Sequence, residues 1–196
     1  HAHAYVYNLA VVRQKAAQLQ AMQSIDRVLY AMKANNNMHI LRLLHALGIG
    51  FDCVAIDEVH YLQRVLQIKP EDILFTPNFA PVTEYQQALQ LGLQLTIDNT
   101  FVLQHWDGLL QGHEVFLRID PRQGHGHHQK VKTAGTHSKF GIPLGEVEQV
   151  AQRCRALNIR VTGLHVHIGS GLTLPDNWRR SAELLLGMLD HFPDVQ

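Results

Sequence analysis

The sequence predicts an α/β fold built on a parallel sheet. Short apolar segments alternate with helical segments six times along the 196 residues, and glycine or proline separates many of them. Such alternation implies parallel strands joined by crossover helices. Hydrophobic residues make up 46% of the chain, which is enough for a buried core. Two architectures fit, a doubly wound open sheet and a (β/α)8 barrel that would be incomplete here, with about six of the eight βα units.

The first half of the chain is assigned by hydrophobic periodicity. The first helix has Leu9, Val12, Ala16 and Leu19 at helical spacing, and the first strand is a short apolar run with aromatic and β-branched residues. A pair of glycines, Gly48 and Gly50, separates the second helix from the second strand. The predicted order is helix 8–22, strand 26–32, helix 36–47, strand 51–55, helix 58–67, strand 73–76 and helix 82–91.

The second half continues the same alternation. Gly92 ends the preceding helix, and each later strand is again a short apolar run. A long polar loop at 120–139 interrupts the pattern after the fifth strand. The predicted order is strand 94–97, helix 100–110, strand 114–119, helix 145–157, strand 160–166 and helix 176–189.

The composition excludes several classes of protein. Charged residues make up 17% and the formal net charge is zero, so there is no electrostatic case for a nucleic-acid or anionic-membrane partner. No apolar run approaches the roughly 18 residues that span a bilayer. Cys53 and Cys154 lack metal or redox spacing, so we expect two reduced, buried thiols in a cytoplasmic protein.

Lys33 is the first candidate for chemistry. Both architectures place the active site at the carboxyl ends of the strands, and Lys33 follows strand 26–32 directly. Burial at this place can lower a lysine pKa, and the neutral amine can form a Schiff base with a carbonyl group. The alternative is a lysine that extends from the strand end into solvent.

The end of strand 160–166 carries a second group of candidates. His165 and His167 are two residues apart on an extended segment, so their side chains point to the same side. Gly169, Ser170 and Gly171 follow, and small residues with free backbone N–H groups suit a phosphate. A plain turn is the alternative interpretation of this glycine–serine segment.

The long loop raises the question of a metal. It contains His125, His127, His128 and His137, and clustered imidazoles can bind a metal ion. No spacing matches a known zinc motif, so we predict a polar loop without a metal. A metal-dependent barrel hydrolase that uses the His165–His167 pair remains an alternative class.

Five segments together resemble one known family. The segments are Y-V-Y at 5–7, Y-A-M-K-A-N at 30–35, G-F-D-C at 50–53, L-R-I at 117–119 followed by S-K-F-G-I at 138–142, and G-L-H-V-H-I-G-S at 163–170. In this order they resemble the pyridoxal-phosphate-dependent decarboxylases that have an alanine-racemase-like barrel. The resemblance covers nearly the whole chain and implies a partial (β/α)8 barrel of that type, with pyridoxal 5'-phosphate as the cofactor.

The resemblance also implies roles for individual residues. Lys33 matches the lysine that carries the cofactor, and His167 matches the histidine that stacks on its ring. The other implied cofactor-binding residues are Asp52, Arg118, Gly169 and Ser170, with the serine near the phosphate. His165 is expected to pack in the barrel.

The implied activity is decarboxylation of an amino acid. The motifs are most similar to those of diaminopimelate decarboxylases, which make L-lysine. Residues 124–136 are closer to the decarboxylase half of a bifunctional aspartokinase–decarboxylase. Alternatives are a decarboxylase for another basic amino acid or carboxynorspermidine, a racemase on the same barrel, and a non-enzymatic cofactor-binding module.

The resemblance further implies that the active enzyme needs more than these residues. We expect residues 1–196 to be part of the barrel domain, with the C-terminal β domain of the family absent from this chain. The isolated chain is therefore expected to be inactive. The full-length enzyme is expected to be a homodimer that acts on a small amino-acid substrate.

Overall fold

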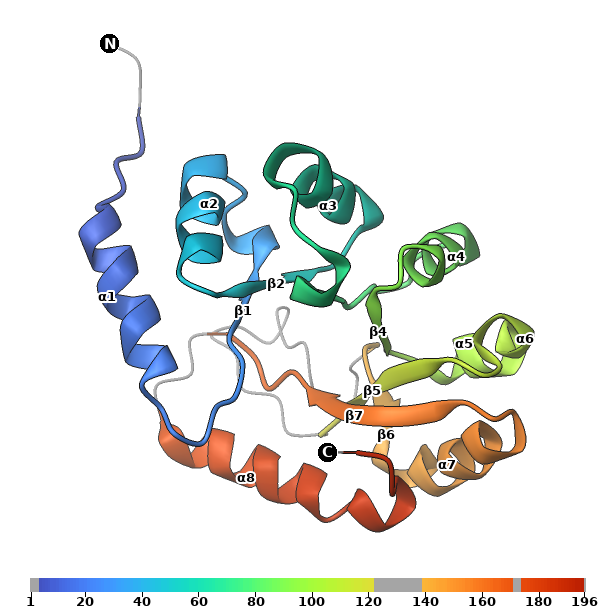
Figure 1. Ribbon diagram of the computed structural model, residues 1–196. Helices are drawn as coiled ribbons and strands as arrows, with labels where there is room; N and C mark the ends of the chain where they lie inside the picture. The colour runs from blue at the N-terminus through green and yellow to red at the C-terminus, as the bar shows by residue number, and fades with distance from the viewer. Residues whose placement is uncertain (1–3, 122–138, 171–173, 196) are drawn as a thin grey trace.

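The computed structural model describes residues 4–121, 139–170 and 174–195, and their strands form one parallel sheet. Helices surround the sheet in an arc, with the strands on the inner side (Figure 1). The strands are β1 Leu29–Ala31, β2 Gly50–Cys53, β3 Ile73–Phe75, β4 Gln94–Ile97, β5 Glu114–Asp120, β6 Ile142–Pro143 and β7 Arg160–Val166.

The strand order distinguishes between the two architectures that the sequence left open. The first five strands are neighbours in chain order, and β5 pairs with β7 as well as with β4. A doubly wound sheet reverses its strand order at a switch point, whereas a barrel adds each strand beside the previous one. The sheet therefore follows the barrel pattern. Among the described residues, β1 pairs with β2 alone, so β1 is an outer strand.

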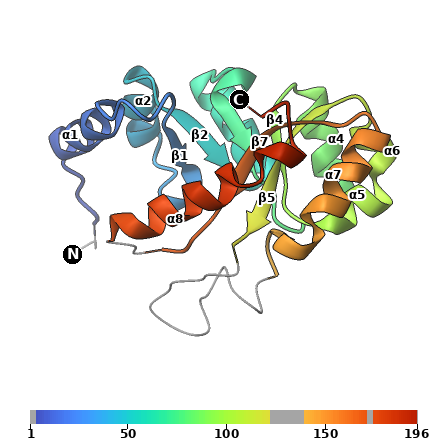
Figure 2. The same ribbon diagram turned by 90° about the horizontal axis from the view of Figure 1, so that it is seen from below.

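The helices follow the predicted order and cover the outer side of the strands. Figure 2 shows α1 and α2 at one end of the arc and α4 to α7 at the other, with α8 running between them. Asparagine side chains begin three helices by accepting a backbone N–H, as helix N-caps do. The helices are α1 Leu9–Gln20, α2 Met38–Ala46, α3 Ile56–Tyr61, α4 Val82–Gln90, α5 Thr100–His105, α6 Asp107–Leu110, α7 Val147–Ala156 and α8 Pro175–Leu186.

Three elements differ from the prediction. The helix predicted at 100–110 is two helices, because Trp106 leaves the helical conformation at φ −125° and packs edge-on against Tyr85 and Phe101. The helix predicted at 58–67 starts earlier as α3 and continues as a π-helical segment, Leu62–Leu66. Strand β6 was not predicted, since two residues are too short to produce a hydrophobic pattern.

The two faces of the sheet differ in polarity. Parallel register aligns Phe51 with Ile73 and Cys53 with Phe75 on one face, which is fully buried against the helices. The opposite, concave face carries polar residues such as Asp52. The apolar face therefore fixes the register, because a shift by one residue would exchange the two faces.

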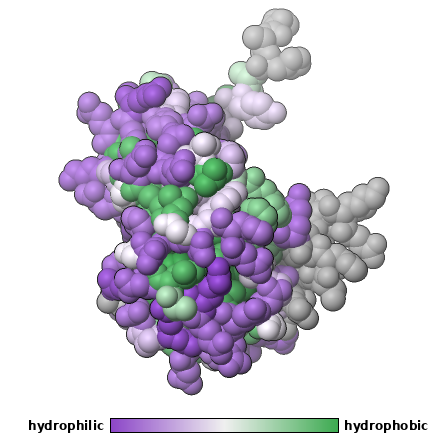
Figure 3. All heavy atoms as spheres, turned by 90° about the vertical axis from the view of Figure 1, so that its right-hand side faces the viewer, coloured by the Kyte–Doolittle hydropathy of each residue, from purple (hydrophilic) through white to green (hydrophobic). Residues whose placement is uncertain are grey.

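The expected burial of the two cysteines is confirmed. Cys53 and Cys154 are buried free thiols, and burial raises the pKa of Cys154 to about 11. Figure 3 faces the side of α4, α5 and α6 and shows separate apolar patches on a largely hydrophilic surface. None of the helices in the described ranges combines the length and apolar character that a bilayer crossing requires.

Gly50 provides a test of the packing at the start of β2. A Cβ atom at this residue would lie 2.7 Å from the Asp72 carbonyl oxygen, a backbone atom. Gly50→Ala should lower the free energy of unfolding by about 1–3 kcal/mol because the collision forces a backbone shift. Gly108→Ala is the control, since no atom lies within 4 Å of its added Cβ. Urea unfolding curves that are equal for the two variants would contradict this account.

Candidate functional site

The register of the strands places the candidate residues on one face. Cα pairing aligns Ala31 with Asp52 and Arg118 with His165, so these positions face the concave side together. His167 follows β7 two residues beyond His165 and points to the same side. Because all strands are parallel, their carboxyl ends lie at one edge. Residues from β1, β2, β5 and β7 therefore meet there.

Lys33 lies in a single 3-10 turn, Met32–Ala34, directly after β1. Its side chain is exposed, and it has no hydrogen bond or ion pair within the described ranges. Of the two arrangements that the sequence left open for this lysine, the structure has the exposed one. Among the described residues, β1 has one neighbouring strand, β2. The positive charge of Lys33 nevertheless acts on Asp52, His165 and His167.

Asp52 lies on β2 with its carboxylate on the concave face. The Thr76 hydroxyl donates a hydrogen bond of 2.7 Å to Asp52 Oδ1. Burial raises the pKa of the Asp52 carboxyl, while the Thr76 hydrogen bond and the charges of Lys33 and Arg118 lower it. The carboxylate therefore depends on its neighbours to remain ionised.

Arg118 is the buried cation of the site, with a side chain that is 7% exposed. Its Nη1 donates a 2.8 Å hydrogen bond to Asn78 Oδ1, and its guanidinium carbon lies 5.1 Å from the centre of the Phe140 ring. Burial lowers the pKa of Arg118, and the carboxylates of Asp98, Asp52 and Asp120 raise it. Three carboxylates thus offset part of the free-energy cost of desolvating one guanidinium.

The two histidines are neutral at physiological pH. Burial lowers the pKa of His165 to about 3, with further lowering by the charges of Arg118, His167 and Lys33. Burial and the charges of Arg118 and Lys33 lower the pKa of His167. The Nδ1 atom of His165 is buried and has no hydrogen-bond partner in the described part of the chain. An uncharged, flat imidazole ring suits stacking on an aromatic ligand.

The small residues after β7 include a glycine with an unusual backbone conformation. Gly169 has φ +122°, a region that L side chains rarely adopt, and Ser170 is exposed. Gly171 lies outside the described residues. The histidines at 125, 127, 128 and 137 and the loop at 124–136 also lie outside them.

The Lys139–Gly141 segment adjoins the site. Gly141 has φ +85°, and its N–H donates a 2.7 Å hydrogen bond to the Asp98 carbonyl oxygen. An added Cβ would lie 2.7 Å from the Asp120 amide nitrogen, so only glycine fits. The Lys139 ammonium lies over the rings of Phe79 and Phe140, at 5.5 and 5.2 Å from their centres.

The sequence analysis gave no role to three residues of the site. Thr76 and Asn78 hold Asp52 and Arg118, and Asp98 is a fully buried carboxylate that acts on Arg118. All three follow β3 or β4 directly, at the carboxyl ends where catalytic residues of barrels gather. Their position after the strands was the signal that the sequence offered, but their partners lie 20 or more residues away along the chain.

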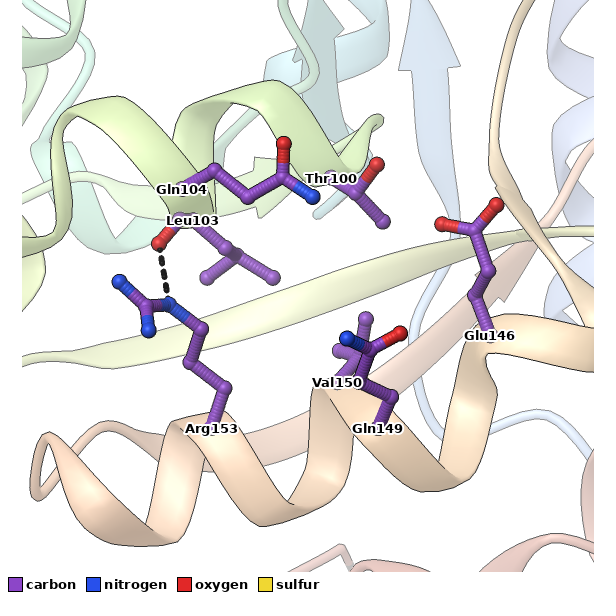
Figure 4. Close-up of a pocket in the computed structure, with 7 residues that line it drawn as sticks. All are labelled: Thr100, Leu103, Gln104, Glu146, Gln149, Val150 and Arg153. Atoms are coloured by element: carbon purple, nitrogen blue, oxygen red, sulfur yellow. Dashed lines mark hydrogen bonds between the residues drawn. The ribbon is translucent and has the colours of Figure 1, made fainter.

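A groove between α5 and α7 is visible in Figure 4, where Arg153 Nε donates to the Leu103 carbonyl oxygen at 2.9 Å. It lies among the outer helices, away from the concave face. In the ranges that the structure describes, no three histidine, cysteine, aspartate or glutamate residues come together as a metal site.

Taken together, the fold and the site define a barrel domain with a lysine, a buried charge network and neutral histidines at the carboxyl ends of its strands. Residues 9–194 match the family described as "Pyridoxal-dependent decarboxylase, pyridoxal binding domain". The chain belongs to this family. The cofactor that the sequence predicted, pyridoxal 5'-phosphate, is the one that this domain binds.

Two curated relatives of the chain are diaminopimelate decarboxylases. The chain is 32% identical to the diaminopimelate decarboxylase of Escherichia coli K12 over 174 residues, which is 86% of this chain and 40% of that protein. It is 33% identical to the enzyme of Methanothermobacter thermautotrophicus over 161 residues, 82% of this chain and 37% of that protein. The chain thus spans about 40% of the length of the curated relatives that it matches.

Solved structures confirm the predicted fold class. Diaminopimelate decarboxylase from Helicobacter pylori, solved with L-lysine, matches with a TM-score of 0.83 and 27% identity over 97% of this chain and 50% of that one. The arginine decarboxylase of Paramecium bursaria Chlorella virus shares the fold, with a TM-score of 0.80. The chain is therefore an α/β structure that covers part of the family's barrel.

The lowered pKa of His165 predicts a pH dependence of stability. Its pKa is about 3 in the folded protein and 6.5 ordinarily, so folding favours the neutral ring. This contribution to stability is fully present above pH 6.5 and is lost as the pH falls toward 3. Replacing His165 by Gln should flatten the decline by at most about 1.4 kcal/mol per pH unit.

The control is His39→Gln, which removes an exposed imidazole on α2. Urea unfolding at a series of pH values measures both variants. The account is wrong if the His165 variant shows the same acid sensitivity as the wild-type protein.

Proposed function

We propose that this chain supplies the cofactor-binding barrel of an amino-acid decarboxylase, with Lys33 as the residue that carries pyridoxal phosphate. The observation that supports this most strongly is an exposed amine without a partner in the described residues, beside Asp52 and the two neutral histidines. The amine is reachable from the mouth of the barrel, so a ligand can approach it.

The residues present fit the cofactor. The flat, neutral His167 ring can stack on a pyridine ring, and its lowered pKa keeps it from repelling a cationic ring nitrogen. Gly169 and Ser170 provide an open backbone and a hydroxyl at a strand end, which suits a phosphate. Asp52 and Arg118 would border the ring from the neighbouring strands.

The chemistry that the cofactor supplies when bound is an electron sink for the charge left on carbon when carbon dioxide departs. The chain's own residues would hold and orient the cofactor. Lys33 would hold the cofactor, and His167 would fix the plane in which it lies. Burial keeps the rings of both histidines uncharged, and the charge of Arg118, which lies within the network of aspartates, lowers their pKa further.

For the substrate we propose meso-diaminopimelate, with L-lysine as the product. The named relatives with the stated identities support this, since several are diaminopimelate decarboxylases. Another basic amino acid is the second candidate, because the ornithine decarboxylase of Leishmania donovani is 29% identical over 169 residues. We propose that the full-length protein works as a homodimer, as the family resemblance implies.

The role of Lys33 predicts a change in visible absorbance. Pyridoxal phosphate added to the protein should give the visible band of a cofactor bound to a lysine amine, and Lys33→Ala should lose at least about 90% of it. Lys69→Ala is the matched control, because Lys69 is an exposed lysine that precedes β3 at the opposite end of the sheet. A band that survives in the Lys33 variant would place the attachment elsewhere.

The proposed substrate predicts a ranking of activities. The full-length protein, loaded with cofactor, should release carbon dioxide from meso-diaminopimelate with a kcat/KM at least about tenfold above that for ornithine, arginine or lysine. Product analysis should identify L-lysine. A higher kcat/KM for ornithine would overturn the substrate and leave the decarboxylase class intact.

A further inference from the structure

The residue after β3, Thr76, is attached to β2 at two points. Its backbone N–H donates to the Cys53 carbonyl oxygen at 2.8 Å, and its hydroxyl donates to Asp52 Oδ1 at 2.7 Å. Its side chain is 3% exposed, so water does not compete for the hydroxyl. The first bond extends the strand pairing by one residue and aims the hydroxyl at the neighbouring carboxylate.

Asp52 needs such a partner because of its surroundings. Burial favours its neutral form, and the hydroxyl bond is the largest influence in the opposite direction. Lys33, which follows β1, and Arg118, on β5, are the charged groups that face it and act in the same sense. A carboxylate held by one fixed donor also keeps one orientation, whereas a free carboxylate can rotate.

The same short segment holds the second charged residue of the site. Asn78, two residues after Thr76, accepts the 2.8 Å hydrogen bond from Arg118. Pro77 lies between them and has a restricted φ, which limits the conformations of the segment. One turn after β3 therefore contacts an acid on β2 and a base on β5.

We propose that Thr76 is a positioning residue, whose hydroxyl holds the Asp52 carboxylate ionised and oriented on the concave face beside Lys33. The role rests on the proposed function, because Asp52 matters to the reaction only if Lys33 carries the cofactor. Thr76 itself acts through Asp52.

Two variants and a matched control test this role. Thr76→Val keeps the shape of the side chain and removes the donor, and Thr76→Ser keeps the donor. Thr96→Val is the control, because Thr96 on β4 is 0% exposed and its hydroxyl has no hydrogen-bond partner within the described ranges. Carbon-13 NMR of the aspartate carboxyl groups in the cofactor-free protein reports Asp52 directly, with Asp52→Asn to assign its signal.

In Thr76→Val, the Asp52 titration midpoint should move to higher pH, because the ionised form loses its donor. Thr76→Ser and the Thr96 control should titrate like the wild-type protein. The dissociation constant for pyridoxal phosphate, measured by the visible band, should rise about tenfold in Thr76→Val, the fold-change expected for one charge-assisted hydrogen bond. The serine variant and the control should stay within about twofold.

The outcomes separate the two proposals. An unchanged Asp52 midpoint in Thr76→Val overturns the positioning role. A shifted midpoint with unchanged cofactor binding also overturns it, since the hydroxyl would then serve the fold alone. A wild-type protein that forms no visible band with pyridoxal phosphate contradicts the proposed function itself, whatever the midpoint of Asp52.

Discussion

The parallel register of the sheet is the constraint on which the site depends. Apolar residues such as Phe51 and Phe75 must face the helices, and this requirement sets which residues face the concave side. Asp52 and His165 are then carried to the same side without any direct attraction between them. A shift of one residue in β2 would bury the Asp52 carboxylate among apolar side chains at a large cost in free energy. The hydrophobic core therefore determines the position of the chemistry.

On the concave face, the buried guanidinium of Arg118 acts on the protonation of the groups near it. Arg118 is desolvated, yet the carboxylates of Asp98, Asp52 and Asp120 act on it and favour its charged form. Its charge favours the deprotonated form of each group, which is the ionised form of Asp52 and the neutral form of the histidines. Burial is the main cause of the neutral histidines, and Arg118 adds to it; for Asp52 the cation acts together with the Thr76 hydroxyl and Lys33 against burial. Asn78 accepts a hydrogen bond from Arg118. Pre-set protonation of this kind suits a site that must bind a charged cofactor without rearranging.

Much of this arrangement was predictable, and the failures have physical causes. Hydrophobic periodicity located six of the seven strands, because each buries an apolar face, whereas the two residues of β6 leave no such pattern. The strand-end rule and the motifs led to Lys33 and His167 at the mouth of the barrel. The strand-end position of Lys33 left both a buried and an exposed side chain open, and the structure has the exposed one. The bonds of Thr76 and Asn78 were not foreseen, because they join strands that are distant in sequence and need a known register.

The central claim is that the carboxyl ends of these parallel strands form one cofactor site around Lys33. A crystal structure of the protein grown with pyridoxal phosphate tests it most directly. The account predicts continuous electron density between the Lys33 Nζ atom and the cofactor, with the His167 ring stacked against the pyridine ring and the phosphate near Ser170. Cofactor density joined to a different lysine, or held at the outer helices with Lys33 left free, would contradict it.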